Sequence, residues 1–132
     1  MGSKTNTQKK ILITGGDGRL GSEIRKLTDC IAPDMRELDV TDLTSCNNAI
    51  KTYDPGVIIH CAAWTDVAGA EQNKEKCWNV NVNGTENMVR SADKRRFVYI
   101  STDYVFDGER GNYSEDDIPN PQNFYSLTKC VG

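Results

Sequence analysis

The stretch Lys10-Ile11-Leu12-Ile13-Thr14-Gly15-Gly16-Asp17-Gly18-Arg19-Leu20-Gly21 decides the fold class of this 132-residue chain. A run of apolar residues typical of a buried strand leads into a glycine-rich turn, and a helical pattern follows. The glycines fit two overlapping frames, Gly16-x-Gly18-x-x-Gly21 and Gly15-x-x-Gly18-x-x-Gly21. Such a turn lets the backbone approach a phosphate and directs a helix N-terminus at the anion. The stretch therefore predicts a dinucleotide-binding turn.

Strand-like and helical patterns alternate along the rest of the chain. After the first strand we expect helices over residues 20–27, 43–53 and 70–92, and strands over 30–32, 37–40, 57–61 and 97–101. Asp42 is suited to cap the second helix, and Asn83-Gly84 is a candidate break in the third. Continuous β-branched strands are typical of a parallel sheet that is buried on both faces. The sequence thus predicts an α/β fold, a doubly wound and mostly parallel sheet of the Rossmann type.

Composition and charge narrow the class of protein. The net charge is −3 and the isoelectric point is near 5.1, which gives no sign of a nucleic-acid or membrane-surface partner. Residues 1–9 read as a polar tail rather than a signal peptide, and 10–132 as one domain, so a cytoplasmic location is the expectation. The five cysteines are scattered without a C-x-x-C pair, which predicts reduced thiols and no metal site. Residues 107–121 read as one long loop, which in a compact domain is typically functional.

Acidic residues follow two of the predicted strands, at the sheet edge where ligands bind. Asp34 is placed to hold the adenosine ribose hydroxyls, although Pro33 beside it equally suits a turn residue. Arg36 is placed to accept a 2′-phosphate, so both NADH and NADPH stay open as cofactors. Asp39 is either a cofactor contact or a neighbour of the helix cap at Asp42.

Three side chains are candidates for proton chemistry. His60 is the only histidine and lies in an apolar strand, which favours a hydrogen-bonded core residue over a general base. Tyr125 and Lys129 are four residues apart and would share one face of a helix that begins near Tyr125. An ammonium beside a phenol lowers the pKa of the phenol from about 10, which makes the tyrosine a usable proton donor and acceptor.

Taken together, the motifs resemble those of the extended short-chain dehydrogenase/reductases. The matching stretches are Thr14-Gly15-x-x-Gly18-x-x-Gly21, Asp39-Val40, Cys61-Ala62-Ala63-Trp64-Thr65, Asn81-Val82-Asn83-Gly84-Thr85, Ser101-Thr102-Asp103-Tyr104-Val105-Phe106 and Tyr125-x-x-x-Lys129. They extend from about Lys10 to Lys129. The run Ser-Thr-Asp-Tyr-Val-Phe-Asp-Gly, with an acidic loop and Pro-x-x-x-Tyr after it, is most similar to the dTDP-4-dehydrorhamnose reductases of that superfamily.

The resemblance implies an NADPH- or NADH-dependent reduction of the C4 keto group of a nucleotide-linked 4-keto-6-deoxy sugar, as in dTDP-rhamnose biosynthesis. Tyr125 would donate a proton to the C4 oxygen, Lys129 would tune Tyr125 and hold the nicotinamide ribose, and Thr102 would hydrogen-bond the substrate oxygen. Asn81 matches a helix asparagine of the family, where a structural bridging role is equally favoured. The remaining implied cofactor contacts are Gly15, Gly18, Arg19 and Leu20 at the pyrophosphate, Asp39 and Val40 at the adenine, Ala62, Ala63 and Thr65 toward the nicotinamide, and Tyr125 itself beside Lys129.

Two departures from the family pattern limit this expectation. Ala68-Gly69 stands where the family usually shows an Asp-Lys pair, so the resemblance implies cofactor binding more directly than the orientation of the substrate. Family members are also much longer, so we expect a chain truncated before the substrate lobe, inactive by itself and prone to form a homodimer through an exposed sheet edge. Two alternatives stay open. One is a combined 3,5-epimerase/4-reductase acting on a UDP-linked sugar, and the other is a non-catalytic cofactor-binding regulatory subunit like that of methionine adenosyltransferase.

Overall fold

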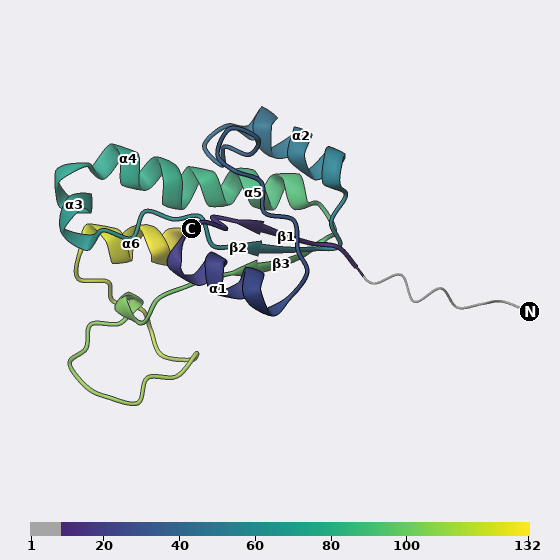
Figure 1. Ribbon diagram of the computed structural model, residues 1–132. Helices are drawn as coiled ribbons and strands as arrows, with labels where there is room; N and C mark the ends of the chain where they lie inside the picture. Colours follow the sequence, from purple (N-terminus) through teal and green to yellow (C-terminus); the bar gives the residue numbers. More distant parts are fainter. Residues whose placement is uncertain (1–8) are drawn as a thin grey trace, which may run out of the picture.

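A parallel sheet forms the centre of the protein in a computed structural model that describes residues 9–132 (Figure 1). Its three strands are β1 (Ile11–Thr14), β2 (Val57–His60) and β3 (Arg96–Tyr99), in the order β1-β2-β3. All pairs are parallel, and Ile11 lies opposite Val57. Residues 1–8 of the predicted polar tail lie outside the described residues.

Helices cover both faces of the sheet, as a doubly wound fold requires. In Figure 1, α1 (Arg19–Leu27) lies on one face, while α2 (Leu43–Tyr53) and α5 (Gly84–Ala92) lie on the other. The helix α6 (Phe124–Val131) and the short α3 (Val67–Gln72) lie beyond the carboxyl ends of the strands. The predicted Rossmann-type architecture is confirmed.

The hydrophobic core consists of two separate clusters. The larger part lies between the sheet and the pair α2 and α5, where Leu12, Ile58 and Met88 are fully buried. Burial of each such side chain contributes about 1.5–3 kcal/mol. A smaller cluster joins Ala70 to Tyr125 and so attaches α6 to α3. The second cluster therefore places the predicted tyrosine helix at the carboxyl edge of the sheet.

The predicted strands over 30–32 and 37–40 are largely wrong. Ile31 forms only an isolated parallel bridge to Leu12, with hydrogen bonds to the backbone on either side of it. Residues 37–40 form no strand, because the amides of Glu37 and Leu38 donate back to the carbonyl of Asp34. Alternate burial of Leu38 and Val40 imitates a strand pattern, yet both side chains simply enter the core.

The predicted helix over 70–92 is divided into several pieces. After α3 the chain breaks at Asn73, and then α4 (Lys74–Trp78) leads through a π-helical turn, η1 (Asn79–Asn83), into α5. Residue 73 leaves the helical region of backbone conformation, so the break lies ten residues before the predicted one. The π turn widens the helix where Asn81 points inward, as such turns commonly do at functional sites.

Two local predictions are confirmed. Asp42 caps α2, because its carboxylate accepts hydrogen bonds from the amides of Thr44 and Ser45. Residues 107–121 form no strand or helix. A further 3₁₀ turn, η2 (Asp103–Val105), leads into this loop.

Substitution of Gly21 tests the packing of α1 on the glycine turn. A β-carbon there would overlap the Gly15 carbonyl and lie 2.9 Å from the Gly16 α-carbon. We expect Gly21→Ala to lower the free energy of unfolding, measured by urea denaturation, by about 3 kcal/mol. Gly111→Ala is the control, because nothing lies within 4 Å of a β-carbon there. Equal stability of the two variants would contradict this packing.

Candidate functional site

The glycine turn presents backbone amides at the start of α1. Gly15 has φ +67°, and its carbonyl accepts a hydrogen bond from the amide of Gly18 at 3.0 Å. Gly18 occupies the N-cap position, and no described side chain caps the helix or places an acid in its first turn. The N-terminal amides of α1 are therefore available to an anion.

The exit of β2 meets this turn closely. A β-carbon on Gly15 would lie 2.6 Å from the amide nitrogen of Ala62, so only glycine permits this approach. Ala62, Ala63 and Thr65 follow β2 at the carboxyl edge, with the first two half-buried and Thr65 exposed. The structure thus brings this predicted group beside the pyrophosphate turn.

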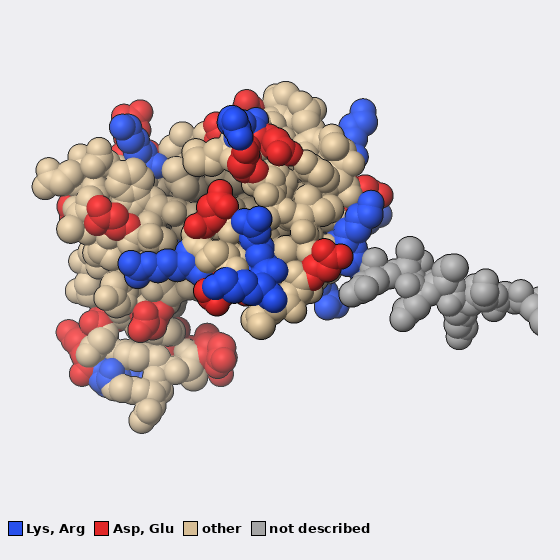
Figure 2. Space-filling view, in the orientation of Figure 1, with Lys and Arg blue, Asp and Glu red and all other residues tan. Residues whose placement is uncertain are grey.

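The helix α1 carries several basic side chains. Arg25 donates to the Gly16 carbonyl at 3.2 Å and to the Asp17 carboxylate at 3.1 Å, and so braces the turn from behind. Arg19 and Leu20, both predicted contacts, are exposed at the start of the helix. Figure 2 shows Lys and Arg side chains gathered over α1, whereas the projecting loop over 107–121 carries mainly acidic ones.

Asp34 and Arg36 form one local unit after the Ile31 bridge. The Asp34 carboxylate accepts the Arg36 side chain at 2.8 Å and the amides of Arg36 and Glu37. The hydrogen bond from Arg36 is the largest effect that lowers the pKa of Asp34. Asp34 therefore has the geometry of a turn residue, while the Arg36 side chain remains 91% exposed.

Asp39 and Val40 lie at a turn rather than at the end of a strand, which corrects the predicted third-strand position. The Asp39 carboxylate accepts the amide and hydroxyl of Thr41, at 2.9 and 2.6 Å. The Val40 side chain is buried and packs against Gly84, and its carbonyl accepts a hydrogen bond from Asn87. The buried Val40 side chain is therefore a core residue in this structure, and its predicted adenine contact stays a prediction.

The helix α6 presents Tyr125 and Lys129 on its inward face. Asn123 caps the start of the helix and forms a capping box. The side chains of Tyr125 and Lys129 are both buried. The Lys129 ammonium lies 4.4 Å from the centre of the Tyr99 ring, and the Tyr99 hydroxyl donates to the Lys129 carbonyl at 2.9 Å. Thr102, which follows β3, lies close enough to the Tyr125 phenol to act on its pKa. The three predicted catalytic residues are thus brought together.

The predicted lowering of the tyrosine pKa is wrong for this structure. Burial raises the pKa of Tyr125, and the neighbouring Thr102 hydroxyl acts only partly against it. Burial also lowers the pKa of Lys129. The ammonium lies over the ring of Tyr99, and burial is the largest effect on the Tyr125 pKa, so sequence spacing alone gave the wrong sign.

Asn81 links the β2 exit to α6. Its side chain is 1% exposed, accepts the amide of Trp64 at 2.8 Å, and donates to the Trp64 carbonyl at 3.1 Å and to the Thr128 hydroxyl at 2.9 Å. This geometry is that of the structural bridge considered from the sequence. Thr128 was missed, and no sequence signal distinguishes it from an ordinary helix residue.

His60 is buried on β2 with both ring nitrogens in hydrogen bonds. Nδ1 lies 2.7 Å from the Thr14 hydroxyl and Nε2 lies 3.2 Å from the Thr85 hydroxyl. Burial, with a smaller contribution from the charge of Lys129, lowers the pKa of His60 to about 4. These contacts favour the core residue predicted for this position.

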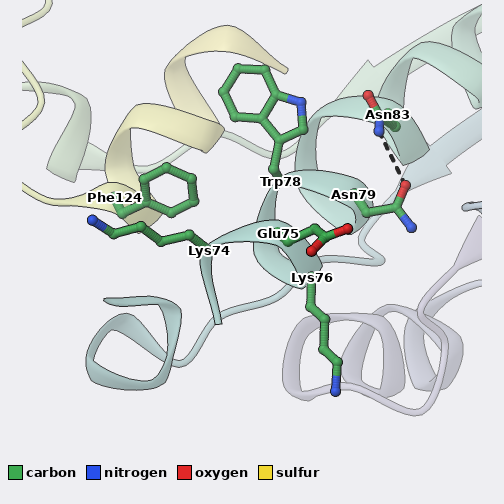
Figure 3. Close-up of a pocket in the computed structure, with 7 residues that line it drawn as sticks. All are labelled: Lys74, Glu75, Lys76, Trp78, Asn79, Asn83 and Phe124. Carbon is green, nitrogen blue, oxygen red and sulfur yellow. Dashed lines mark hydrogen bonds between the residues drawn. The ribbon is translucent and has the colours of Figure 1, made fainter. Parts of the chain in front are cut away.

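A hollow of about 690 Å³ lies apart from these groups. Figure 3 shows its lining by α4, η1 and the start of α6: Lys74, Glu75, Lys76, Trp78, Asn79, Asn83 and Phe124. Neither Thr102, Tyr125 nor Lys129 lines it. We therefore place the candidate site at the glycine turn and α6, and not in this hollow. Within residues 9–132, no cluster of side chains suits a metal ion and no helix is long and apolar enough to cross a membrane.

Comparison with known proteins assigns the family. A family model described as the RmlD substrate binding domain matches residues 9–132. The chain belongs to this RmlD family. It is 35% identical over 136 residues to a dTDP-4-dehydrorhamnose reductase of Mycobacterium tuberculosis, covering 94% of this chain and 44% of the relative. The chain thus spans about half the length of such relatives.

Solved structures agree with this assignment. The dTDP-4-dehydrorhamnose reductase of Bacillus anthracis, in complex with NADP, superimposes with a TM-score of 0.90 at 32% identity, covering 94% of this chain and 47% of that one. A second kind of relative is the methionine adenosyltransferase 2 subunit beta of Danio rerio, 32% identical over 94% of this chain and 42% of its own. The proteins that are similar to this chain therefore include both reductases and a subunit of another enzyme.

The buried histidine predicts a pH dependence of stability. The unfolded chain takes up a proton on His60 near pH 6.5, whereas the folded chain does so only near pH 4. Stability is therefore lost as the pH falls between these values. We expect the free energy of unfolding to fall by about 3 kcal/mol more in the wild type than in His60→Phe between pH 7 and 4. Urea denaturation measures this difference, and carboxylate effects cancel because both chains share them. Parallel pH profiles would contradict the burial of neutral His60.

Proposed function

We propose that this chain forms the cofactor-binding half of an NADPH-dependent reductase that acts on the C4 keto group of a nucleotide-linked 4-keto-6-deoxy sugar. One observation carries the proposal: the glycine turn, the exit of β2 and the Tyr125 helix meet at one carboxyl edge of the parallel sheet. Ligands of doubly wound folds bind at this edge. The similarity to dTDP-4-dehydrorhamnose reductases supports the choice of reaction.

The residues of the turn fit a dinucleotide pyrophosphate. A β-carbon on Gly18 would approach only the Gly15 carbonyl oxygen, at 3.3 Å, so the space in front of Gly18 is open. Together with the uncapped N-terminus of α1, this opening suits a doubly charged phosphate pair. Arg19 lies exposed beside it, and the half-buried Ala62 and Ala63 would line the path to the nicotinamide.

The Asp34–Arg36 unit favours NADPH over NADH. Four donors already occupy the Asp34 carboxylate, two from the Arg36 side chain and two backbone amides, which leaves it less free to hold ribose hydroxyls. The exposed Arg36 guanidinium has the charge and geometry to bind a 2′-phosphate. The solved Bacillus anthracis relative in complex with NADP is consistent with this preference.

Thr102, Tyr125 and Lys129 each have one role in the proposed mechanism. The bound nicotinamide would supply a hydride to C4 of the sugar. Tyr125, whose raised pKa keeps the phenol protonated at neutral pH, would give its proton to the C4 oxygen. Thr102 would orient that oxygen and stabilise the phenolate that remains, and Lys129 would hold the nicotinamide ribose.

A regulatory-subunit function is the second candidate, because of the similarity to methionine adenosyltransferase 2 subunit beta. Binding alone does not require Thr102, Tyr125 and Lys129 to assemble at one edge, and this assembly favours the reductase. A combined 3,5-epimerase/4-reductase would use the same half and would differ in its sugar and nucleotide. The proposal includes a cytoplasmic location and a homodimer, for which the edge strand β3 of the described sheet offers a surface.

Cofactor binding is testable on the chain itself. We expect saturable quenching of tryptophan fluorescence on titration with NADPH, and weaker quenching with NADH. Gly18→Val should abolish it, since the added side chain would occupy the phosphate position, while the exposed Gly111→Val serves as control. Equal quenching in both variants would contradict the assigned turn.

Catalysis is testable in the full-length enzyme that contains this chain. Tyr125→Phe should lower the rate of NADPH oxidation with a 4-keto sugar nucleotide by about 10³-fold and leave NADPH binding unchanged. Tyr104→Phe is the matched control, because the Tyr104 ring lies edge-on to Tyr125 at 6.5 Å and is given no proton to transfer. An active Tyr125→Phe enzyme would exclude the proposed proton donor, and no oxidation by the wild type would favour the regulatory function.

A further inference from the structure

A chain of buried hydrogen bonds runs through His60 between elements that are distant in sequence. The amide of Ala62 donates to the Thr14 hydroxyl at 3.1 Å, and that hydroxyl lies 2.7 Å from Nδ1 of His60. Across the ring, Nε2 lies 3.2 Å from the Thr85 hydroxyl, which donates to the Asn81 carbonyl at 2.7 Å. The ring thus joins β1, beside the glycine turn, to the π turn.

The directions of these bonds fix the tautomer of His60. The Thr85 hydroxyl has one proton and gives it to the Asn81 carbonyl, so it accepts from the ring and Nε2 carries the hydrogen. Nδ1 then accepts the proton of the Thr14 hydroxyl, whose oxygen accepts the Ala62 amide. In the opposite tautomer the Thr14 proton would lose its acceptor on Nδ1, at a side chain 2% exposed.

The same chain continues into the tyrosine helix. Asn81 donates through its side chain to the Thr128 hydroxyl at 2.9 Å, and that hydroxyl donates to the Tyr125 carbonyl at 2.7 Å. Asn81 also holds both backbone groups of Trp64, just after the β2 exit. No described side-chain nitrogen or oxygen that is fully buried lacks a hydrogen-bond partner.

The surroundings of the ring disfavour a positive charge on it. The titratable groups that face His60 are Tyr99 of β3, with ring centres 6.4 Å apart, and Lys129 of α6, whose charge acts on the ring. The Lys129 ammonium in turn lies over Tyr99. Protonation of His60 would give the ring a positive charge, which would repel the Lys129 ammonium. It would also place a hydrogen on Nδ1, and this nitrogen could then no longer accept the hydrogen bond from Thr14.

We propose that His60, as the neutral Nε2–H tautomer, is a positioning residue that fixes the glycine turn and the Tyr125 helix relative to one another. It contacts neither cofactor nor substrate in this role. The inference rests on the proposed cofactor site, and it adds a residue that acts through Thr14 and Thr85. Loss of the ring would leave the buried Thr14 proton without its acceptor and the Thr85 hydroxyl without its donor, so the glycine turn and the Tyr125 helix would no longer be linked through one side chain.

The tautomer is directly measurable because the chain has a single histidine. Long-range ¹H–¹⁵N correlation spectra of the tag-free, ¹⁵N-labelled chain should show one protonated ring nitrogen, Nε2, and one unprotonated acceptor, Nδ1. The pattern should persist from pH 8 to pH 5. An Nδ1–H tautomer, or titration near the ordinary histidine pKa of about 6.5, would overturn the proposal.

The coupling is testable through NADPH affinity. Thr14→Val and Thr85→Val should each raise the dissociation constant by about tenfold, and the double variant should raise it by less than the product. In a His60→Phe background the same pair should act independently. The exposed Thr52→Val is the control, and His60→Gln, which keeps a polar group, should restore part of the affinity.

The outcomes separate positioning from a merely structural role. The positioning role would be overturned if the variants melted at lower temperatures but kept the NADPH dissociation constant of the wild type. It would also be overturned if, in the presence of His60, the effects of Thr14→Val and Thr85→Val on the dissociation constant simply multiplied. Where a variant does not fold, the tautomer spectrum of the wild type still decides the hydrogen-bond chain. No NADPH binding by the wild type would contradict the proposed function, and the spectrum is independent of that result.

Discussion

Close backbone packing around Gly15 is the constraint on which the rest of the site depends. Gly15 faces the amide of Ala62 with no room for a β-carbon, and Gly21 faces the Gly15 carbonyl in the same way. These two contacts seat α1 and the exit of β2 on one turn. Because packed backbone cannot yield as a side chain can, the positions of the helix N-terminus and of the β2 exit are fixed together.

The other half of the site is built from polar contacts rather than from close backbone packing. The helix α6 is attached through the small cluster around Tyr125 and through Asn81, which joins Thr128 to Trp64. Burial costs these polar groups their hydration, so each needs a partner with defined geometry, and such networks hold one arrangement where apolar packing would tolerate several. The Tyr125 phenol thereby lies near Thr102 at the carboxyl edge of the sheet.

Much of this was predictable from sequence, and what was not has physical causes. The glycine frame, the cap at Asp42 and the Tyr125 helix depend on local rules and on spacing, and the structure agrees with them. The strand expected over 37–40 failed because Leu38 and Val40 are buried by tertiary packing while the backbone turns back on Asp34. The predicted direction of the Tyr125 pKa shift was wrong because that direction depends on burial and on the position of the Lys129 ammonium. A four-residue spacing in the sequence determines neither of them.

The central claim is that one sheet edge gathers the glycine turn, the β2 exit and α6 into a single cofactor site. Amide chemical-shift mapping of the ¹⁵N-labelled chain on addition of NADPH tests it most directly. The account predicts that the perturbed amides fall in three stretches, 15–20, 62–65 and 125–129, with a common dissociation constant. Shifts confined to the hollow around Trp78 and Asn83, or to the glycine turn without α6, would contradict it.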